Sequence, residues 1–261
     1  MGQLSGKRAF VTGANSGIGQ AIAIEMAKEG ANVAVHGRSL EKLEDTIRAI
    51  EATGSKAVPL VADFEDESTI KPMCTDALRE LGGIDIVVNN AAMDLGGVNV
   101  VDIDGVGWDT LYQVNMKTYF LVSKFTAPAM IEQKTGGRFI NVGSVGGKLA
   151  QAGLAHYNSA KMAVTGFGRS FAAEVGEHGI TVNTICPGFT ETKLNSIIFN
   201  DMARETGRPY DEIHDEEMLG NMLKMLILPA DIAHLAVFLA SDKARAITAQ
   251  DINVCAGLCL W

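Results

Sequence analysis

Short apolar runs rich in Val, Ile and Ala recur along the chain, separated by longer segments with a helical repeat of apolar positions. The runs show little alternation of apolar and polar side chains, which is typical of strands covered on both faces. We therefore expect strands at Arg8–Thr12, Asn32–His36, Ala57–Val61, Asp85–Asn89, Arg138–Val142, Thr181–Ile185 and Asp251–Val254.

The segments between these runs predict amphipathic helices, of which the clearest are Gly17–Lys28, Ser39–Ala52, Glu67–Leu81 and Ala155–Glu177. Alternation of strands and helices is typical of an α/β fold, in which helices cover both faces of a doubly wound parallel sheet. No internal repeat, low-complexity tract or Pro/Ser-rich linker interrupts the pattern. We expect one domain over residues 1–261.

One segment departs from this rhythm, from about residue 190 to residue 228. It is rich in charged residues and Met and has no strand signal, and long insertions of this kind are usually lids or binding loops. We expect a substrate-binding lid. Its apolar candidates for covering a substrate are Leu194, Ile197, Ile198, Met202 and Leu219, whereas Arg204 and Arg208 are candidates for binding an anionic group, and the sequence leaves both open.

Composition and charge narrow the class of partner. The net charge of -9 argues against a nucleic-acid partner, because binding to the phosphate backbone needs clustered Lys and Arg. No stretch is apolar for long enough to suggest a membrane span, and no apolar leader starts the chain. The four cysteines have no metal-ligand spacing, so we expect no metal site and a reducing, cytoplasmic location.

A glycine-rich turn follows the first strand and opens the first helix: Thr12-Gly13-Ala14-Asn15-Ser16-Gly17-Ile18-Gly19. Gly13 allows a tight turn, Gly17 lets the backbone approach a pyrophosphate, and Gly19 permits close packing of helix on strand. Free N–H groups at the helix start then face the phosphates. This context favours nucleotide binding over a turn without a ligand.

Tyr157 and Lys161 lie four residues apart on a predicted helix, so their side chains share a face. A nearby ammonium group stabilises a phenolate and lowers the pKa of the tyrosine, which suits acid–base catalysis near neutrality. Ser144 and Asn89-Asn90-Ala91-Ala92 follow two other strands, at the carboxyl edge where open α/β sheets bind ligands.

Taken together, the glycine turn, Asn90, Asn115, Ser144, Tyr157-x-x-x-Lys161 and Pro187-Gly188 resemble the short-chain dehydrogenase/reductase family, in its shorter single-domain branch. The resemblance implies a seven-stranded Rossmann-like sheet in the order 3-2-1-4-5-6-7. It also implies a catalytic tetrad, with Tyr157 as general acid/base and Ser144 bonded to the substrate oxygen. Lys161 would hold the nicotinamide ribose and lower the Tyr157 pKa, and Asn115 would anchor a water.

Asn115 has support of its own, because it shares a helical face with Leu111 and Val122 and so turns an amide toward the core, where it needs a partner. The alternative is an amide whose bonds are satisfied within the core. The resemblance further implies a set of cofactor-binding residues: Gly13, Asn15, Ser16, Gly17, Ile18, Gly19, Arg38, Ser39, Asp63, Phe64, Asn90, Ala91, Tyr157, Lys161, Pro187, Gly188, Thr190 and Thr192. We expect Asp63 near the adenine, unless it caps the next helix.

The choice between NAD and NADP depends on Val35-His36-Gly37-Arg38-Ser39. An acidic residue there would bond the ribose 2′-OH of NAD, whereas Arg accommodates the 2′-phosphate of NADP. Gly37 stands where NAD users of the family often carry Asp, and Arg38 and Ser39 offer partners to a phosphate. Ser16 departs from the pattern, since many NADP users have a second cation there. The sequence favours NADP and allows NAD.

These residues predict an NAD(P)-dependent oxidoreductase that transfers a hydride between nicotinamide and a ketone or secondary alcohol of sugar, polyol, hydroxy-acid or 3-oxoacyl type. The alternatives are a catalytically silent NADP-binding regulator and a nucleotide-sugar epimerase or dehydratase. Residues beside the tetrad that are expected to line the substrate pocket are Met93, Asp94, Lys148, Gln151 and His156, although a solvated Lys148 is favoured.

The chain ends on the apolar sequence Cys255-Ala256-Gly257-Leu258-Cys259-Leu260-Trp261. An exposed tail of this kind would form a sticky patch. We expect it to be buried between the subunits of a homotetramer, the alternative being a tail folded onto its own subunit.

Overall fold

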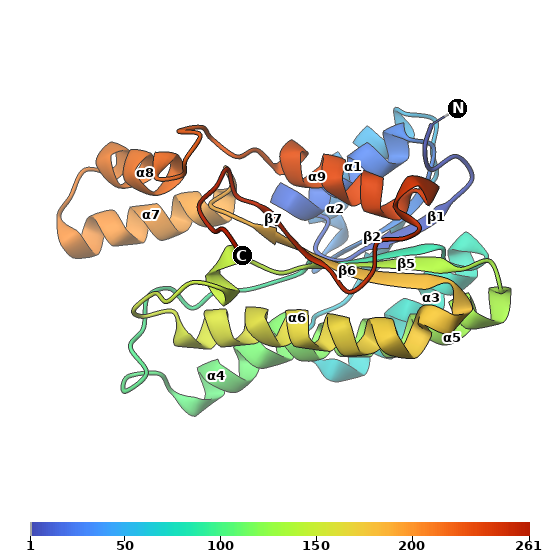
Figure 1. The fold of residues 1–261 in the computed structure, drawn as a ribbon, viewed down its shortest axis with the longest axis horizontal. Helices are drawn as coiled ribbons and strands as arrows, with labels where there is room; N and C mark the ends of the chain where they lie inside the picture. Colours follow the sequence, from blue (N-terminus) through green and yellow to red (C-terminus); the bar gives the residue numbers. More distant parts are fainter. Residues whose placement is uncertain (1) are drawn as a thin grey trace.

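A computed structural model describes residues 2–261. Within that range seven parallel strands form one sheet in the order β3-β2-β1-β4-β5-β6-β7 (Figure 1). The strands are β1 (Arg8–Val11), β2 (Asn32–Gly37), β3 (Ala57–Val61), β4 (Ile86–Asn89), β5 (Gly137–Val142), β6 (Ile180–Pro187) and β7 (Asp251–Val254). The expected fold class and strand order are confirmed, and the strand bounds differ from the expected ones by a residue or two.

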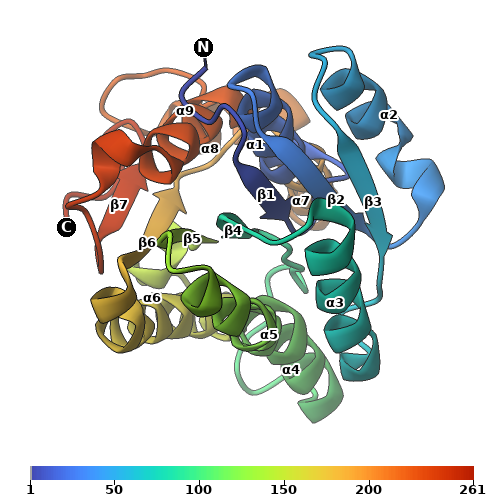
Figure 2. The ribbon, with the colours of Figure 1, turned by 90° about the vertical axis from the view of Figure 1, so that its right-hand side faces the viewer.

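Helices cover both faces of this sheet, with α1, α2 and α9 on one face and α3, α4, α5 and α6 on the other (Figure 2). Their bounds are α1 (Gly17–Lys28), α2 (Leu40–Glu51), α3 (Ile70–Leu81), α4 (Gly105–Tyr112), α5 (Thr118–Gln133), α6 (Ala155–Val175), α7 (Lys193–Thr206), α8 (Tyr210–Leu219) and α9 (Pro229–Ala240). Shorter turns are η1 (Glu67–Thr69), η2 (Gln113–Lys117, a π-helix), η3 (Val145–Gly147), η4 (Gly176–His178) and η5 (Asp242–Ala244).

The two faces of the sheet make separate hydrophobic cores, as β1 shows. Ala9 and Val11 pack in the core with α1 and α9, whereas Phe10 between them packs in the core with α3 and α5. Because successive side chains of a strand point to opposite faces, a strand covered on both faces needs an apolar residue at every position. This requirement explains the unbroken apolar runs in the sequence.

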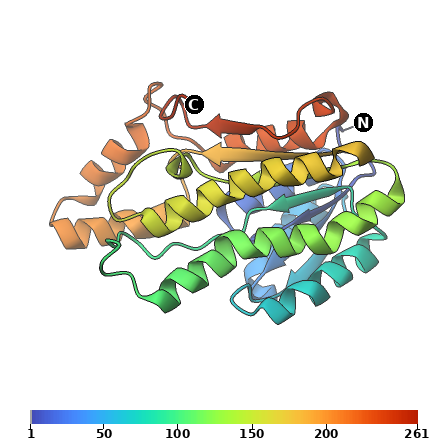
Figure 3. The same cartoon turned by 60° about the horizontal axis from the view of Figure 1, so that its bottom comes forward.

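The segment expected as a lid is largely helical. Helices α7 and α8 pack on each other beyond the carboxyl ends of the strands, apart from the main body (Figure 3). They share a small core of their own, in which Phe199, Ile213 and Met218 are buried. A helix pair with its own core can sit over the edge of the sheet without adding a strand to it.

Candidate active site

A cavity of about 700 Å³ lies at the carboxyl ends of the strands and is bounded by α7. Its wall includes most of the residues selected from the sequence, namely Gly13, Asn15, Ser16, Gly17, Ile18, Gly19, Arg38, Asp63, Phe64, Asn90, Ala91, Ser144, Tyr157, Lys161, Pro187, Gly188 and Thr192. Ser39, Asn115 and Thr190 do not line it. We call the walls that follow β1, β2 and β3 the β1–β3 end, and the walls formed by Asp94, Gln151, Tyr157 and α7 the β4–β6 end.

The glycine turn makes close contacts that only glycine permits. A Cβ on Gly19 would lie 2.3 Å from the Asn90 Nδ2 atom and equally close to the Gly13 carbonyl oxygen. Gly13 and Gly17 have φ angles of 64° and 56°, in the left-handed region that favours glycine. Ser16 begins α1 but its side chain caps no N–H group. The first N–H groups of α1 therefore lie at the cavity wall without a side-chain cap, which fits a pyrophosphate.

Asn90 clamps this turn onto β4. Its Nδ2 donates to the carbonyl oxygens of Thr12 at 2.9 Å and Gly13 at 3.1 Å, and its backbone N–H donates to the Thr12 Oγ1 at 2.9 Å. These bonds hold the turn in one geometry. A preformed turn loses less conformational entropy when a ligand binds.

His36 is a second support of the turn, which the sequence analysis missed. Its Nδ1 accepts the Gly13 N–H at 3.1 Å, and its Nε2 lies 3.1 Å from the Ala62 carbonyl oxygen. A carbonyl oxygen only accepts, so Nε2 carries the hydrogen and the ring is neutral. Burial lowers the pKa of His36 to about 4, consistent with this tautomer. The ring also stacks on Phe64, with centroids 4.0 Å apart.

Two cations line the β1–β3 end after β2. Arg38 is exposed at the wall, as the sequence suggested, and Lys42 joins it from one turn further along, in α2. Ser39 instead caps α2, its hydroxyl accepting the Lys42 N–H at 3.4 Å. Lys42 supplies a second positive charge that Ser16 lacks, and its spacing of four residues from Arg38 was the signal available in the sequence.

Asp63 lines the cavity beyond β3, beside Phe64. Its Oδ1 accepts the Glu65 N–H at 3.1 Å, whereas the residue that caps the following η1 turn is Asp66. Asp63 is therefore not the helix cap that was its alternative reading. Its carboxylate is exposed and placed for a hydrogen-bond donor of a bound base.

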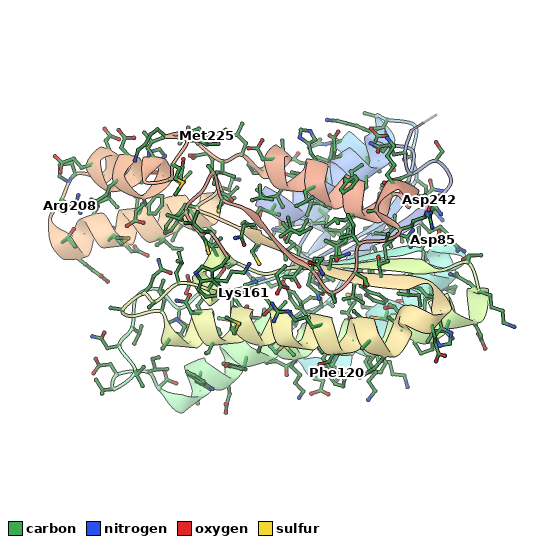
Figure 4. The ribbon with its side chains drawn as sticks, viewed as in Figure 1. Asp85, Phe120, Lys161, Arg208, Met225 and Asp242 are labelled. Atoms are coloured by element: carbon green, nitrogen blue, oxygen red, sulfur yellow. The ribbon has the colours of Figure 1, made fainter. Side chains whose placement is uncertain are left out.

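Tyr157 and Lys161 share the face of α6 that borders the cavity. The Lys161 side chain reaches between α6 and the sheet, on the side toward α7 (Figure 4). It is only 2% exposed, and its Nζ donates to the Val142 carbonyl oxygen at 3.0 Å and lies 5.7 Å from the centroid of the Tyr157 ring. Burial lowers the pKa of Lys161 to about 8.

The pKa of Tyr157 differs from the expectation of a value near neutrality. Burial and the negative charge of Asp94 raise the pKa of its phenol, a hydrogen bond with Ser144 lowers it, and the net result is a pKa of about 12. The Lys161 ammonium is bonded to Val142 and lies across the ring, so it does not offset the loss of hydration. The protein groups alone thus keep Tyr157 protonated at neutral pH.

Asn115 is fully buried in the π-helix η2, like Leu111 and Val122 on the same face. Its Oδ1 accepts the Met93 N–H and its Nδ2 donates to the Met93 carbonyl, both at 2.8 Å. This is the satisfied amide that was its alternative reading. The side chain ties η2, between α4 and α5, to the loop after β4.

Ser144 and Thr190 have different local roles. The Ser144 Oγ accepts the Gly146 N–H at 3.0 Å, and its hydroxyl lies at the cavity wall, where it forms the hydrogen bond with Tyr157 that lowers the Tyr157 pKa. Thr190 is buried, and its Oγ1 donates to the Gly188 carbonyl oxygen at 3.0 Å. Thr190 therefore braces the loop after β6, and Thr192, the cap of α7, lines the cavity in its place.

The α7 part of the β4–β6 end is apolar except for Lys193 and Asn195, and it contains three of the apolar candidates of the expected lid. Leu194, Ile197 and Ile198 of α7 line the cavity, whereas Met202 packs within the α7–α8 pair. Leu219 is not part of the wall. Arg204 pairs with Asp201 and Arg208 with Glu216, and Arg208 lies at the outer tip of the pair, far from Lys161 (Figure 4). The arginines do not reach the cavity.

Of the five residues expected beside the tetrad, Met93, Asp94 and Gln151 line the cavity, and His156 is buried next to it. The expectation of a solvated Lys148 is wrong. Its Nζ donates to the Asn253 Oδ1 at 2.7 Å, so it joins the loop after β5 to β7. That partner is distant in the sequence, so no local pattern indicates the bond.

Comparisons with known proteins place the chain in a family. Residues 7–203 match the short chain dehydrogenase family. A 3-oxoacyl-[acyl-carrier-protein] reductase FabG of Staphylococcus aureus is 35% identical over 97% of this chain and 98% of its own length. The crystal structure of carveol dehydrogenase from Mycobacterium avium in complex with NAD has a TM-score of 0.93 at 27% identity, covering 98% of this chain and 99% of that one. An actinorhodin polyketide ketoreductase with NADPH has a TM-score of 0.92 at 32% identity, covering 99% of each chain.

The chain belongs to the short-chain dehydrogenase/reductase family. It is an NAD(P)-dependent oxidoreductase that acts on a ketone or secondary alcohol. Neither the family match nor these relatives support a silent regulator.

Proposed function

We propose that this enzyme reduces ketones with NADPH, with Tyr157 as proton donor. The observation that carries the proposal is one cavity whose wall joins the capless start of α1, the Arg38–Lys42 pair, Ser144, Tyr157 and Lys161. A bound dinucleotide with its pyrophosphate at α1 and its adenosine toward β2 and β3 would extend its other half toward Tyr157. This arrangement is the one that open α/β sheets use at their carboxyl edge.

The proposed chemistry assigns each group one task. When bound, NADPH supplies the hydride that is added to the carbonyl carbon of the substrate. Tyr157 donates its phenolic proton to the carbonyl oxygen, and the Ser144 hydroxyl turns from Tyr157 to donate a hydrogen bond to the same oxygen. Lys161, held at Val142, places its ammonium group 5.7 Å from the centroid of the Tyr157 ring, where its positive charge favours the phenolate left after proton transfer.

The preference for NADPH rests on charge at the β1–β3 end. Arg38 and Lys42 offer two cations to a 2′-phosphate, and no carboxylate in the described segment from Val35 to Leu40 would repel it. NAD(H) is bound more weakly, without these two ionic contacts.

The preference for reduction rests on the protonation state of Tyr157. A phenol with a pKa of about 12 is protonated at pH 7, the form that a carbonyl reduction needs, whereas alcohol oxidation needs the phenolate. Reduction should therefore be insensitive to pH between about 6 and 7, below the Lys161 pKa of about 8, and oxidation should accelerate as pH rises above 7.

A panel of ketones, followed by nicotinamide absorbance with NADPH and NADH in parallel, tests the function. The proposal predicts turnover of at least one apolar ketone, with NADPH giving the higher kcat/KM. The proposal would be overturned by a protein that binds NADPH but reduces none of the ketones in the panel at any pH.

We also propose a homotetramer in the cytoplasm, with the last residues at an interface. Leu260 and Trp261 are 76% and 70% exposed, and the exposed Met222 lies against nearby Gly257. Leu258 instead lines the cavity and Cys259 is buried, so part of the tail folds onto its own subunit. All four cysteines are unpaired and buried, which fits a reducing compartment. Among residues 2–261, no helix has the length and apolar character needed to span a membrane.

Removing only Leu260 and Trp261 spares the cavity wall and isolates the interface. The expected result is a smaller mass in solution than that of the parent protein. An unchanged assembly state after this deletion would exclude the tail from the interface.

A further inference from the structure

The β4–β6 end of the cavity contains one carboxylate, Asp94, whose side chain is only 12% exposed. Leu149, Leu154 and Leu194 line the same cavity, together with the polar residues Gln151, Lys193 and Asn195. The other carboxylates of the described cavity wall, Asp63 and Glu65, follow β3, at the opposite side of the sheet order. A largely buried carboxylate needs a partner, since removing a charge from water is costly.

The Asp94 carboxylate is held through one of its two oxygens. Oδ1 accepts the N–H groups of Leu95 at 2.8 Å and Gly96 at 3.2 Å. No hydrogen bond to Oδ2 is found within residues 2–261. The preceding residue, Met93, is fixed at both its N–H and its carbonyl by Asn115. The carboxylate thus stands on a rigid base with one acceptor oxygen to spare.

His156 lies behind this carboxylate and completes the arrangement. Its Nε2 is 3.6 Å from the Asp94 Oδ1, just beyond hydrogen-bond distance. The ring is entirely buried, and within the described chain neither of its nitrogens has a hydrogen-bond partner. Buried polar atoms of a folded protein are nearly always paired, so an unpaired histidine next to a carboxylate needs an explanation. A small inward shift of Asp94 would pair the two.

The position of Asp94 relates it to the chemistry. His156 immediately precedes Tyr157 on α6, and the negative charge of Asp94 raises the pKa of both Tyr157 and Lys161. Asp94 also lines the same cavity as Ser144 and Tyr157, so it faces the space that a substrate at these two residues would fill. At that place it attracts hydrogen-bond donors and repels anions.

We propose that Asp94, positioned by His156, is a specificity-determining residue that binds a hydroxyl or ammonium group of the substrate beside the reacting carbon. This inference rests on the proposed function and adds the substrate class to it. The leucines of the wall receive the body of the substrate, and Asp94 selects a donor on the neighbouring carbon. Substrates with a carboxylate at that carbon are rejected.

A series of secondary alcohols that differ in one group tests the proposal. The series is 1-phenyl-1,2-ethanediol, 2-amino-1-phenylethanol, 1-phenyl-1-propanol and mandelate, which carry a hydroxyl, an ammonium, a methyl group and a carboxylate in turn. Oxidation with NADP⁺ gives kcat/KM, and quenching of bound NADPH fluorescence gives the affinity of the non-reacting complex.

The wild-type protein should prefer the diol, the amino alcohol or both to 1-phenyl-1-propanol by at least about tenfold, and should disfavour mandelate. Asp94→Asn keeps an acceptor and the backbone bonds, so it should lose the preference for ammonium only. Asp94→Ala should lose both preferences. Asp102→Asn makes the same chemical change in the same loop, at an exposed site outside the cavity. It should leave the order of kcat/KM among the four substrates unchanged.

His156→Phe keeps the volume of the ring and removes its nitrogens. As a positioning residue, His156 should affect the ratio of kcat/KM between the diol and 1-phenyl-1-propanol, while a purely structural role would lower both values together. An Asp94→Ala protein with the wild-type order of affinities would overturn the proposal.

The two readouts separate this inference from the proposed function. Binding in the expected order without any oxidation or reduction would support Asp94 as the binding residue and contradict the activity. Turnover of all four compounds with similar kcat/KM and similar affinities would support the proposed activity and contradict the role of Asp94.

Discussion

The β1–β3 end of the cavity and its β4–β6 end differ in how their polar groups are held. At the β1–β3 end, Asn90 and His36 bond directly to the glycine turn, and these bonds leave its conformation little freedom. At the β4–β6 end, Asp94 keeps one oxygen unbonded and His156 has no partner in the described chain. The hydrogen bonds that shape the glycine turn at the β1–β3 end are thus already formed without a ligand. At the β4–β6 end, polar atoms of Asp94 and His156 still lack a hydrogen-bond partner within residues 2–261. This contrast suits a common cofactor at one end and a particular substrate at the other.

The substitution expected to disrupt the β1–β3 end most adds a methyl group to its glycine turn. Gly19→Ala places a Cβ 2.3 Å from the Asn90 Nδ2 and from the Gly13 carbonyl oxygen, so the turn must open. We expect a loss of about 2 kcal/mol or more in stability and a loss of NADPH affinity of about a hundredfold or more, measured by thermal unfolding and by fluorescence titration.

Gly166→Ala provides the matched control, because a Cβ on this α6 residue meets no atom within 4 Å. This variant should be as stable as the parent or slightly more so, since alanine favours helix. Equal effects of the two substitutions would show that crowding at the turn is not the cause.

The neutral His36 makes the β1–β3 end sensitive to acid. Its pKa is about 4 in the folded protein, below the ordinary value of 6.5 that it has when unfolded. Between these values the unfolded chain binds the proton and the folded one does not, so stability is full above pH 6.5 and is lost as pH falls toward 4. The loss from this group is roughly 3 kcal/mol.

The test compares the thermal midpoint of the wild type with that of His36→Asn at intervals from pH 7 to pH 4. Asn retains a side-chain acceptor for the Gly13 N–H but does not titrate. The difference between the two proteins should shrink as pH falls. A constant difference across that range would mean that His36 is not the titrating group.

The smallest of these effects concerns the two cations at the ribose. Arg38→Ala should weaken NADPH binding by about 1.5–3 kcal/mol and NADH binding much less, because one charge-assisted bond to the 2′-phosphate is lost. Lys42→Ala should act in the same direction. Arg48→Ala, which removes an exposed, ion-paired cation of α2, is the control and should change neither affinity. Equal losses for the two cofactors would remove Arg38 from the ribose site.

A more direct switch toward NADH is hindered by the fold. A Cβ on Gly37 would lie 3.1 Å from the Leu43 side chain, tighter than ordinary contact. An Asp at this position would therefore need Leu43 to move, so a poor yield of Gly37→Asp would reflect packing as well as charge.

The sequence predicted the fold well because both faces of the sheet are buried, which forces apolar runs at every strand. It also predicted the residues of the glycine turn and the Tyr157–Lys161 pair, whose spacing is local. The helical structure of α7 and α8 was not predicted, since the core that these helices share is small and separate from the main one. His36 and Lys148 were missed for another reason: their partners Gly13 and Asn253 become neighbours only when β1 meets β2 and β5 approaches β7.

Tertiary contacts also determine properties of the site that local spacing does not predict. Asn115 was assigned from a helical face, and only the fold shows that its amide is used by Met93. The pKa of Tyr157 was expected to fall because Lys161 is one turn away, but burial of both groups is a tertiary effect that raises it. Local spacing thus predicted that Tyr157 and Lys161 share one face, at the cavity wall, but did not determine their protonation.

The central claim is that Tyr157 donates the proton at a cofactor site that works without it. The most direct measurement is a single turnover of NADPH with an apolar ketone, for the wild type and for Tyr157→Phe. Phe keeps the ring and removes the donor, so the rate of NADPH oxidation should fall by about 10²–10⁴-fold while the NADPH dissociation constant changes little. A Tyr157→Phe protein that oxidises NADPH at nearly the wild-type rate would contradict the account.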